Sequence, residues 1–263
     1  MQTLFRWIKR LTIIAVLTAL SFLIVYQLTW YNEQQKLYEL RQEAQNVYEQ
    51  AEPSPTTRPT AKPEPTAKPP EIDSRINALR EEYQNDDIIG FLSIEGTNIE
   101  YPVLQTDNNE FYLNHGLDKA YSAAGSLFLD YENDSAKEDK NTIVYGHNMN
   151  ADIMFHSLRK YTDKEFFDTH RYITFNTLYA SNTWEIFSFY RATADFYYIQ
   201  AIFRDEDEFG ALLEGMVARS MHESDVSVTK EDRVLTLSTC TNETDGTFFV
   251  VNAKLVATEA FDE

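Results

Sequence analysis

The chain contains a single cysteine, Cys240, among its 263 residues. One thiol excludes a dithiol redox centre, and without any His-x-x-x-His spacing it leaves no group of three or four ligands for zinc. We therefore expect no metal and no other cofactor. Cys240 closes the apolar run that begins at Val234, so it lies at the end of a predicted β-strand. It is either a reactive thiol or a buried residue that acts as a small hydrophobe.

Charged residues are absent from residues 11–32, which follow a basic stretch at 1–10. About 20 apolar residues cross a bilayer as a helix, and Trp30 and Tyr31 lie where the far interface would be. We expect a cytoplasmic tail at 1–10, a single-pass signal-anchor at 11–32, and the rest of the chain outside the cell membrane. A cleavable signal peptide is the alternative, but its apolar region would be unusually long, and no small-x-small cleavage site follows.

Proline is nearly confined to one segment, because seven of the eight prolines lie in residues 53–70, among Thr, Lys and Ala. This composition is typical of a stiff, extended linker, although Pro/Thr-rich segments also serve as ligands of partner proteins. Between the anchor and this linker, apolar residues recur at helical spacing. We therefore expect a juxtamembrane helix at 33–52.

Basic residues are scarce after the linker. Residues 71–263 hold 15 Lys and Arg against 36 Asp and Glu, a net formal charge of −21. So acidic a surface argues against nucleic acid as a partner, since phosphate contacts require positive charge. The same residues include one proline, many aromatics and enough apolar side chains for one substantial core.

Alternating apolar and polar residues predict that strands dominate this domain. We expect strands at 88–94, 125–130, 142–145, 172–176, 184–192, 233–239 and 248–258, and helical segments at 73–83, 110–113, 153–160, 164–170 and 206–222. The apolar face of the last helix is expected to consist of Phe209, Leu212, Leu213, Val217 and Met221. Because no strand–helix–strand rhythm recurs, the fold is predicted to be mostly β, an antiparallel sheet or barrel.

A thiol becomes a useful nucleophile when a base or a cation stabilises its thiolate. Of the five histidines, His147 stands out because it directly follows a predicted strand, in Tyr145-Gly146-His147-Asn148-Met149. The other four lie in helical or polar loop contexts. A thiol and a histidine that both lie at strand ends favour nucleophilic catalysis by Cys240, with His147 as acid and base.

These segments resemble class B sortases, the membrane-anchored cysteine transpeptidases of Gram-positive bacteria, over nearly the whole chain. Thr236-Leu-Ser-Thr-Cys240 is similar to the family's active-site strand, and Ile143-Val-Tyr-Gly-His-Asn-Met149 to its histidine segment. Residues 98–103, 109–113 and 125–130 are also similar, and the helix at 206–222 resembles the insertion that separates class B from class A. The resemblance implies that residues 71–263 form an extracellular catalytic domain, folded as a closed eight-stranded sortase β-barrel with peripheral helices.

The resemblance also implies roles for single residues. Cys240 would attack the carbonyl between Thr and Gly in the C-terminal sorting signal of a secreted protein, of the Asn-Pro type associated with class B, and form a thioester. His147 would protonate the departing amine and deprotonate the incoming one, an amine of peptidoglycan or of a pilin subunit. Four residues match positions that line the family's substrate groove, where ordinary packing is the other explanation: Asn109, Leu113, Tyr145 and Ser238.

One position departs from the family. Near the start of the last strand the family has an arginine that stabilises the oxyanion, whereas this chain has Phe248 there and no arginine after Arg233. Arg191 and Arg204 are the candidates to replace it. Losing one oxyanion donor costs about 10²–10³ in rate, so a catalytically impaired sortase-like domain that binds partners is the alternative to an active transpeptidase. A third hypothesis is a tethered adhesive or scaffolding domain with a structural Cys240.

Overall fold

The computed structural model describes residues 2–54, 72–136, 139–149, 152–192, 195–240 and 248–261, and of residues 2–6, 8–10 and 240 it describes the backbone alone. The linker predicted at 53–70 lies almost wholly outside the described residues. The chain divides into two compact units, Met1–Gln42 and Glu43–Glu263.

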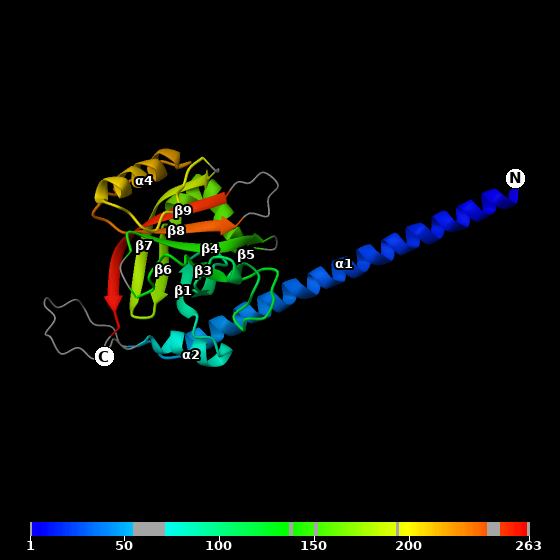
Figure 1. Ribbon diagram of the computed structural model, residues 1–263, viewed down its shortest axis with the longest axis horizontal. Helices are drawn as coiled ribbons and strands as arrows, with labels where there is room; N and C mark the ends of the chain where they lie inside the picture. The colour runs from blue at the N-terminus through cyan, green and yellow to red at the C-terminus, as the bar shows by residue number, and fades with distance from the viewer. Residues whose placement is uncertain are drawn as a thin grey trace. The chain divides into compact units, whose positions relative to one another are not determined.

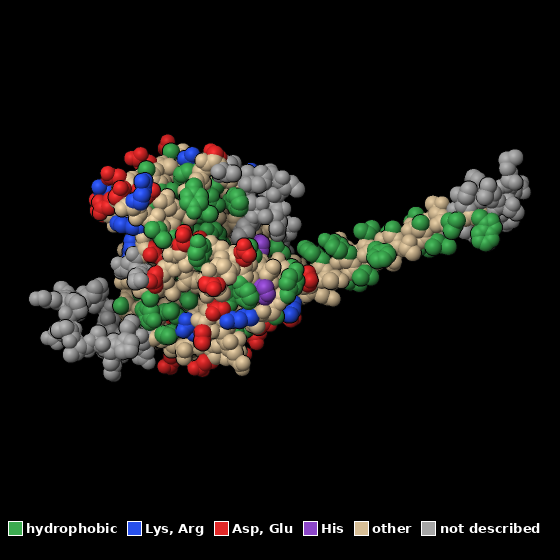
Figure 2. Space-filling view, viewed as in Figure 1, with side chains coloured by type: hydrophobic (Ala, Val, Ile, Leu, Met, Phe, Trp, Pro, Cys, Tyr) green, Lys and Arg blue, Asp and Glu red, His purple; other side chains and the backbone are tan. Residues whose placement is uncertain are grey.

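A single continuous helix, α1 (Gln2–Gln50), covers both the predicted anchor and the helix predicted at 33–52. Large exposed apolar side chains occur at most positions from Leu11 to Tyr31, so they lie all round the helix. Figure 2 shows in green those on the face in view. A helix that is apolar all round is suited to a lipid environment, where its backbone polar groups are satisfied within the helix. By length and composition α1 is therefore able to cross a membrane.

The end of α1, residues 43–50, belongs to the second unit. Tyr48 is buried there, with its ring stacked on that of Phe91 at 4.0 Å between centroids and its hydroxyl hydrogen-bonded to the Asn176 side chain. After the linker the chain returns to this helix end, because the backbone N–H of Ser74 donates to Ser54 Oγ at 3.0 Å. The described residues on the two sides of the linker are thus in direct contact.

The described residues form five further helical elements beside the sheet: α2 (Ser74–Tyr83), η1 (Phe111–Leu113), η2 (Phe155–Thr162), α3 (Lys164–Thr169) and α4 (Glu206–Arg219). The sequence sets where they begin. The Asp205 carboxylate accepts a hydrogen bond from the Glu208 N–H at the start of α4, whose first turn is entirely acidic. Both features stabilise a helix N-terminus, the first by capping it and the second by its favourable interaction with the helix dipole.

Eight strands close into a barrel (Figure 1) in the order β3-β2-β1-β6-β7-β9-β8-β4, and the pairing of β3 with β4 completes the circle. Among the described strands, β2–β3 and β4–β8 pair in parallel and the other pairs are antiparallel. The short β5 pairs with the last residues of β4. This confirms the predicted closed eight-stranded β-barrel. The strands are β1 (Ile88–Ile94), β2 (Glu100–Leu104), β3 (Leu127–Leu129), β4 (Asn141–Met149), β5 (Ile153–Met154), β6 (Tyr172–Thr177), β7 (Ala180–Ala192), β8 (Val234–Cys240) and β9 (Phe248–Ala260).

Three local predictions need correction. β2 was not among the predicted strands; it contains Pro102, a residue that normally argues against a strand. In place of the helix predicted at 153–160, residues 153–154 form the short strand β5 and residues 155–162 form the 3₁₀ helix η2. In α4 the buried face consists of Phe209, Leu212, Leu213 and Met216. Val217, which lies within the helix but off this face, and Met221, which lies beyond the helix end at Arg219, are each 50% exposed.

An apolar cluster lies between α4 and the sheet. The buried side chains of α4 pack there with those of Phe187 and Tyr190 on β7 and Val250 on β9. Figure 1 shows α4 lying along this part of the barrel. The helix therefore stabilises the sheet region that includes the start of β9 and the end of β7.

Candidate active site

Two neighbouring strands bring the predicted catalytic pair together. β4 and β8 run parallel and in register, from Asn141 beside Val234 to His147 beside Cys240. Because parallel strands run in the same direction, both reach the same rim of the barrel, where the backbones of His147 and Cys240 are side by side. Two residues that are far apart in the sequence are thus neighbours in the fold.

Gly146 permits a close approach of β4 just before His147. A Cβ atom at this position would lie 2.3 Å from Leu127 Cδ2 and 2.8 Å from the Phe155 ring. Both neighbours are buried in a well-packed region, so they have little room to move aside. The absence of a side chain at Gly146 therefore lets the strand that carries His147 pack closely against Leu127 and Phe155.

The half-buried His147 ring is held by a backbone carbonyl. Its Nε2 lies 2.7 Å from the carbonyl oxygen of Leu113. Since a carbonyl oxygen can only accept, this hydrogen bond assigns the proton to Nε2, and Nδ1 carries the lone pair of the neutral ring. Nδ1 is buried and has no hydrogen-bond partner among the described residues. It is therefore the nitrogen available to take up and release a proton.

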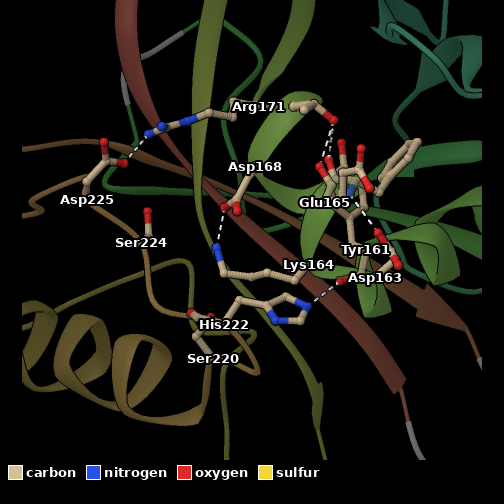
Figure 3. Close-up of polar contacts among 12 residues, drawn as sticks. Tyr161, Asp163, Lys164, Glu165, Asp168, Arg171, Ser220, His222, Ser224 and Asp225 are labelled. Atoms are coloured by element: carbon tan, nitrogen blue, oxygen red, sulfur yellow. Dashed lines mark hydrogen bonds and ion pairs between the residues drawn. The ribbon is translucent and has the colours of Figure 1, made fainter.

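The other four histidines make structural contacts. Each has a ring nitrogen hydrogen-bonded to a nearby oxygen: His115 to the Phe111 carbonyl, His156 to the Asn148 side chain, His170 to the Phe166 carbonyl and His222 to the Tyr161 carbonyl. Figure 3 shows the last of these contacts and, elsewhere in the same view, the ion pair between Arg171 and Asp225. These arrangements explain the four histidines without a role in chemistry.

Two of the predicted groove residues meet on one carboxylate that sequence reasoning missed. Tyr145 Oη donates to Asp130 Oδ2 at 2.7 Å, and Asn109 Nδ2 donates to the same oxygen at 2.9 Å. Asp130 is buried and follows β3 directly. Its signal in the sequence was an acid placed immediately after an apolar strand.

The other two predicted groove residues are placed differently. Leu113 contributes its backbone carbonyl to His147, so its contact with the site does not depend on the identity of its side chain. Ser238 is buried in β8, and its hydroxyl lies 2.8 Å from Tyr198 Oη. Tyr198 comes from the segment before α4, and no pattern in the sequence indicated this contact.

Phe248 lies beside the thiol-bearing strand. In the antiparallel pair β8–β9, Ser238 is opposite Val250, so extending the register brings Phe248 level with Cys240. Its side chain is half-buried against the apolar cluster below α4. The position that carries an arginine in the resembling family thus contributes to apolar packing in this chain.

The two candidate replacements for that arginine lie elsewhere. Arg191 is opposite Phe249, and its guanidinium carbon is 5.0 Å from the centre of the Phe249 ring. Successive strand residues alternate between faces, so Arg191 and Phe249 occupy the sheet face opposite to that of Phe248. The Arg204 side chain is 83% exposed and forms an ion pair with Glu208 at 3.1 Å. Arg191 is therefore directed away from the face of Phe248, and Arg204 lies outside the strands, where it is paired with Glu208 at the surface.

A model of the sortase domain matches residues 92–256, more than half of the chain. Sortase B of Listeria monocytogenes serovar 1/2a is 42% identical over 161 residues, which make up 61% of this chain and 65% of that protein, slightly less than two thirds of its length. Sortase B of Staphylococcus aureus is 35% identical over 174 residues, which make up 65% of this chain and 71% of that protein.

Solved structures give the same result for the fold. Sortase B from Bacillus anthracis in complex with AAEK1 superposes with a TM-score of 0.76 and 33% identity, covering 86% of this chain and 99% of that one. A Staphylococcus aureus sortase B–substrate complex superposes with a TM-score of 0.70 and 28% identity, covering 86% and 96%. From its matching domain, its relatives and its eight-stranded barrel, the chain belongs to the sortase family, and within it to class B.

Proposed function

We propose that this protein is a membrane-anchored cysteine transpeptidase in which Cys240 is the nucleophile and His147 the general acid and base. The observation that carries the proposal is the register of β4 and β8, which pairs these two residues at one rim of the barrel. Nδ1 of His147 supports it, because no hydrogen bond from the described part of the chain occupies this nitrogen and a proton-transfer group needs such a nitrogen.

The first half-reaction transfers an acyl group to the enzyme. The Cys240 thiolate attacks the carbonyl carbon of the Thr–Gly bond of a sorting signal and forms a C–S bond. As the C–N bond breaks, the His147 imidazolium gives its Nδ1 proton to the departing amine. A thioester between Cys240 and the threonine carbonyl remains, beside a neutral imidazole.

The second half-reaction reverses the proton transfer. An incoming amine attacks the thioester carbonyl, Nδ1 of His147 takes up the proton that the amine loses, and the C–S bond breaks to return the thiolate. The Leu113 carbonyl accepts from Nε2–H in both protonation states of the ring. It therefore keeps the imidazole in one orientation through both steps, which positions Nδ1 without reorganisation.

The anchor and the chemistry together suggest a location and partners. We place the segment at 11–32 in the cell membrane as a single-pass anchor and the catalytic domain outside the cell. Its substrates there are secreted proteins that carry a C-terminal sorting signal, and its acceptor is an amine of peptidoglycan or of a pilin subunit. The net charge of −21 over residues 71–263 is compatible with peptide and amine partners.

The test is to incubate the full-length protein, in detergent, with a panel of Asn-Pro sorting-signal peptides that contain a Thr–Gly bond, together with an amine. Mass spectrometry then measures the thioester and the transpeptidation product. We expect both to form and both to vanish in Cys240→Ala. Product that persists in Cys240→Ala, or a parent that yields none with any peptide, would contradict the proposal.

Phe248→Arg tests how the oxyanion is stabilised. Because one oxyanion donor is worth about 10²–10³ in rate, we expect the variant to turn over roughly 10²-fold faster than the parent. An unchanged rate would mean that other groups, such as backbone N–H donors, already stabilise the oxyanion. Product from Phe248→Arg alone would favour the binding module over the working enzyme.

A further inference from the structure

Asp130 is a buried carboxylate that lies between two parts of the candidate active site. It is 3% exposed and accepts three hydrogen bonds. Oδ1 accepts from the backbone N–H of Glu132 at 2.8 Å, and Oδ2 accepts from the side chains of Tyr145 at 2.7 Å and Asn109 at 2.9 Å. Among the described residues it forms no ion pair, so hydrogen-bond donors from side chains and the backbone compensate its burial.

The two side-chain donors come from different elements. Tyr145 is on β4, two residues before His147, while Asn109 begins the loop that continues through η1 to Leu113. Asp130 Oδ2 therefore ties this loop to β4. The same loop reaches β4 a second time, where the Leu113 carbonyl accepts from His147. Because the two ties share one short loop, loosening the first changes the position of the second.

A role in the local turn accounts for only part of this arrangement. The bond from the Glu132 N–H to Oδ1 is the common side-chain turn of an Asp with the residue two positions later, and it stabilises the chain after β3. It leaves the other oxygen unexplained. Oδ2 takes two side-chain donors from two separate elements, which a turn residue has no need to do.

The three bonds also explain why a carboxylate occupies the position. All three partners are donors, so the group must accept on both of its oxygens. An amide of the same shape would accept on one side only and would direct its NH₂ at a donor on the other. Charged acceptors also form the stronger hydrogen bonds, which helps to hold the loop in a single position.

We propose that Asp130 is a positioning residue of the active site, which fixes the loop 109–113 against β4 and thereby holds His147, Tyr145 and Asn109 in place. The inference rests on the proposed transpeptidase function for its kinetic readout. Its structural content, that Asp130 controls the environment of His147, stands independently of the substrate.

The kinetic test uses the full-length protein in detergent, the peptide panel described above, and the variant Asp130→Asn. We expect kcat/KM to fall about 10- to 100-fold. The matched control is Asp73→Asn, which alters a buried carboxylate that pairs with Arg75 at 2.7 Å and caps α2. It should lower the melting temperature but leave kcat/KM within twofold. Equal effects of the two variants on kcat/KM would overturn the proposal.

A double-mutant cycle separates positioning from general destabilisation. Tyr145→Phe removes one donor from Oδ2, so it should reduce kcat/KM in the parent but have almost no further effect in Asp130→Asn. Independent structural losses would instead multiply. If Asp130→Asn does not fold, the contact between the loop and β4 can be tested from its donors, with Tyr145→Phe, Asn109→Ala and their double variant. Both donors bind Oδ2 of Asp130, so their effects on kcat/KM should overlap. Losses that multiply in the double variant would overturn the inference.

A readout without substrate separates this inference from the proposed function. In the full-length protein labelled with ¹⁵N-histidine, NMR should find the Nε2–H tautomer of neutral His147 in the parent and a mixture of tautomers in Asp130→Asn. A parent that turns over no peptide but shows this change would refute the transpeptidase and support the positioning role. An identical His147 signal in both proteins, with unchanged kcat/KM, would refute the positioning role alone.

Discussion

Replacing Tyr48 with alanine removes a buried aromatic contact between the end of α1, residues 43–50, and the rest of the second unit. The side chain is 7% exposed, with its ring against Phe91, the Arg75 guanidinium carbon 4.7 Å from the ring centre, and its hydroxyl bonded to Asn176. Truncating a buried aromatic residue to alanine costs about 3–5 kcal/mol. We take about 3 kcal/mol here, because a helix end can partly close the cavity. For a domain of this size that corresponds to a fall in melting temperature of about 6–12 °C.

The assay is thermal unfolding of the full-length protein in detergent, followed by near-ultraviolet circular dichroism of the aromatic side chains. Tyr38→Ala is the matched control, since Tyr38 lies on the same helix but is 55% exposed. We expect it to shift the melting temperature by less than about 2 °C, because exposed substitutions are usually worth within about 0.5 kcal/mol. If Tyr48→Ala shifts the melting temperature no more than Tyr38→Ala does, the end of α1 does not contribute to the stability of the domain.

Two further predictions follow from packing and ionisation. Gly146→Ala should reduce the free energy of unfolding by about 1–3 kcal/mol and turnover at least tenfold, because its Cβ would displace Leu127 or the strand carrying His147. Gly210→Ala is the control, because its Cβ would lie 4.0 Å from the nearest atom; it should stabilise α4 by up to about 1 kcal/mol and leave turnover unchanged. Denaturant titrations measure the unfolding free energies of both variants, and peptide kinetics measure their turnover. Similar effects of the two substitutions would contradict the packing argument. Burial raises the pKa of Tyr48 to about 12, against about 10 in an unfolded chain. The buried, neutral hydroxyl therefore contributes fully to the free energy of unfolding below pH 10, and this contribution declines as the pH rises from 10 to 12. Unfolding free energies measured across that range should fall more steeply for the parent than for Tyr48→Phe, and equal slopes would show that Tyr48 titrates normally.

Local pattern and residue type determined the main features of this protein from its sequence. An uncharged apolar stretch is a helix suited to lipid wherever it occurs, and alternating side chains predict strands, so α1 and most of the barrel strands followed without knowledge of the fold. The single thiol and a histidine, each at a predicted strand end, identified Cys240 and His147 as candidates. The segments that surround them carried the resemblance to class B sortases, which the comparisons confirmed. The roles of the individual site residues stay a prediction.

Contacts between distant segments were decided only by the tertiary structure. Strand order and register depend on the packing of the whole barrel, so no local pattern could place His147 beside Cys240. The same holds for hydrogen bonds that cross elements: the Leu113 carbonyl on His147, the Tyr198 hydroxyl on Ser238, and Asp130 between Tyr145 and Asn109. Every residue has a backbone carbonyl, so the identity of Leu113 could not predict its contact with His147. The sequence also does not reveal whether an aspartate such as Asp130 is buried or exposed. The sequence thus determined which groups could react, and the tertiary structure determined how they are held.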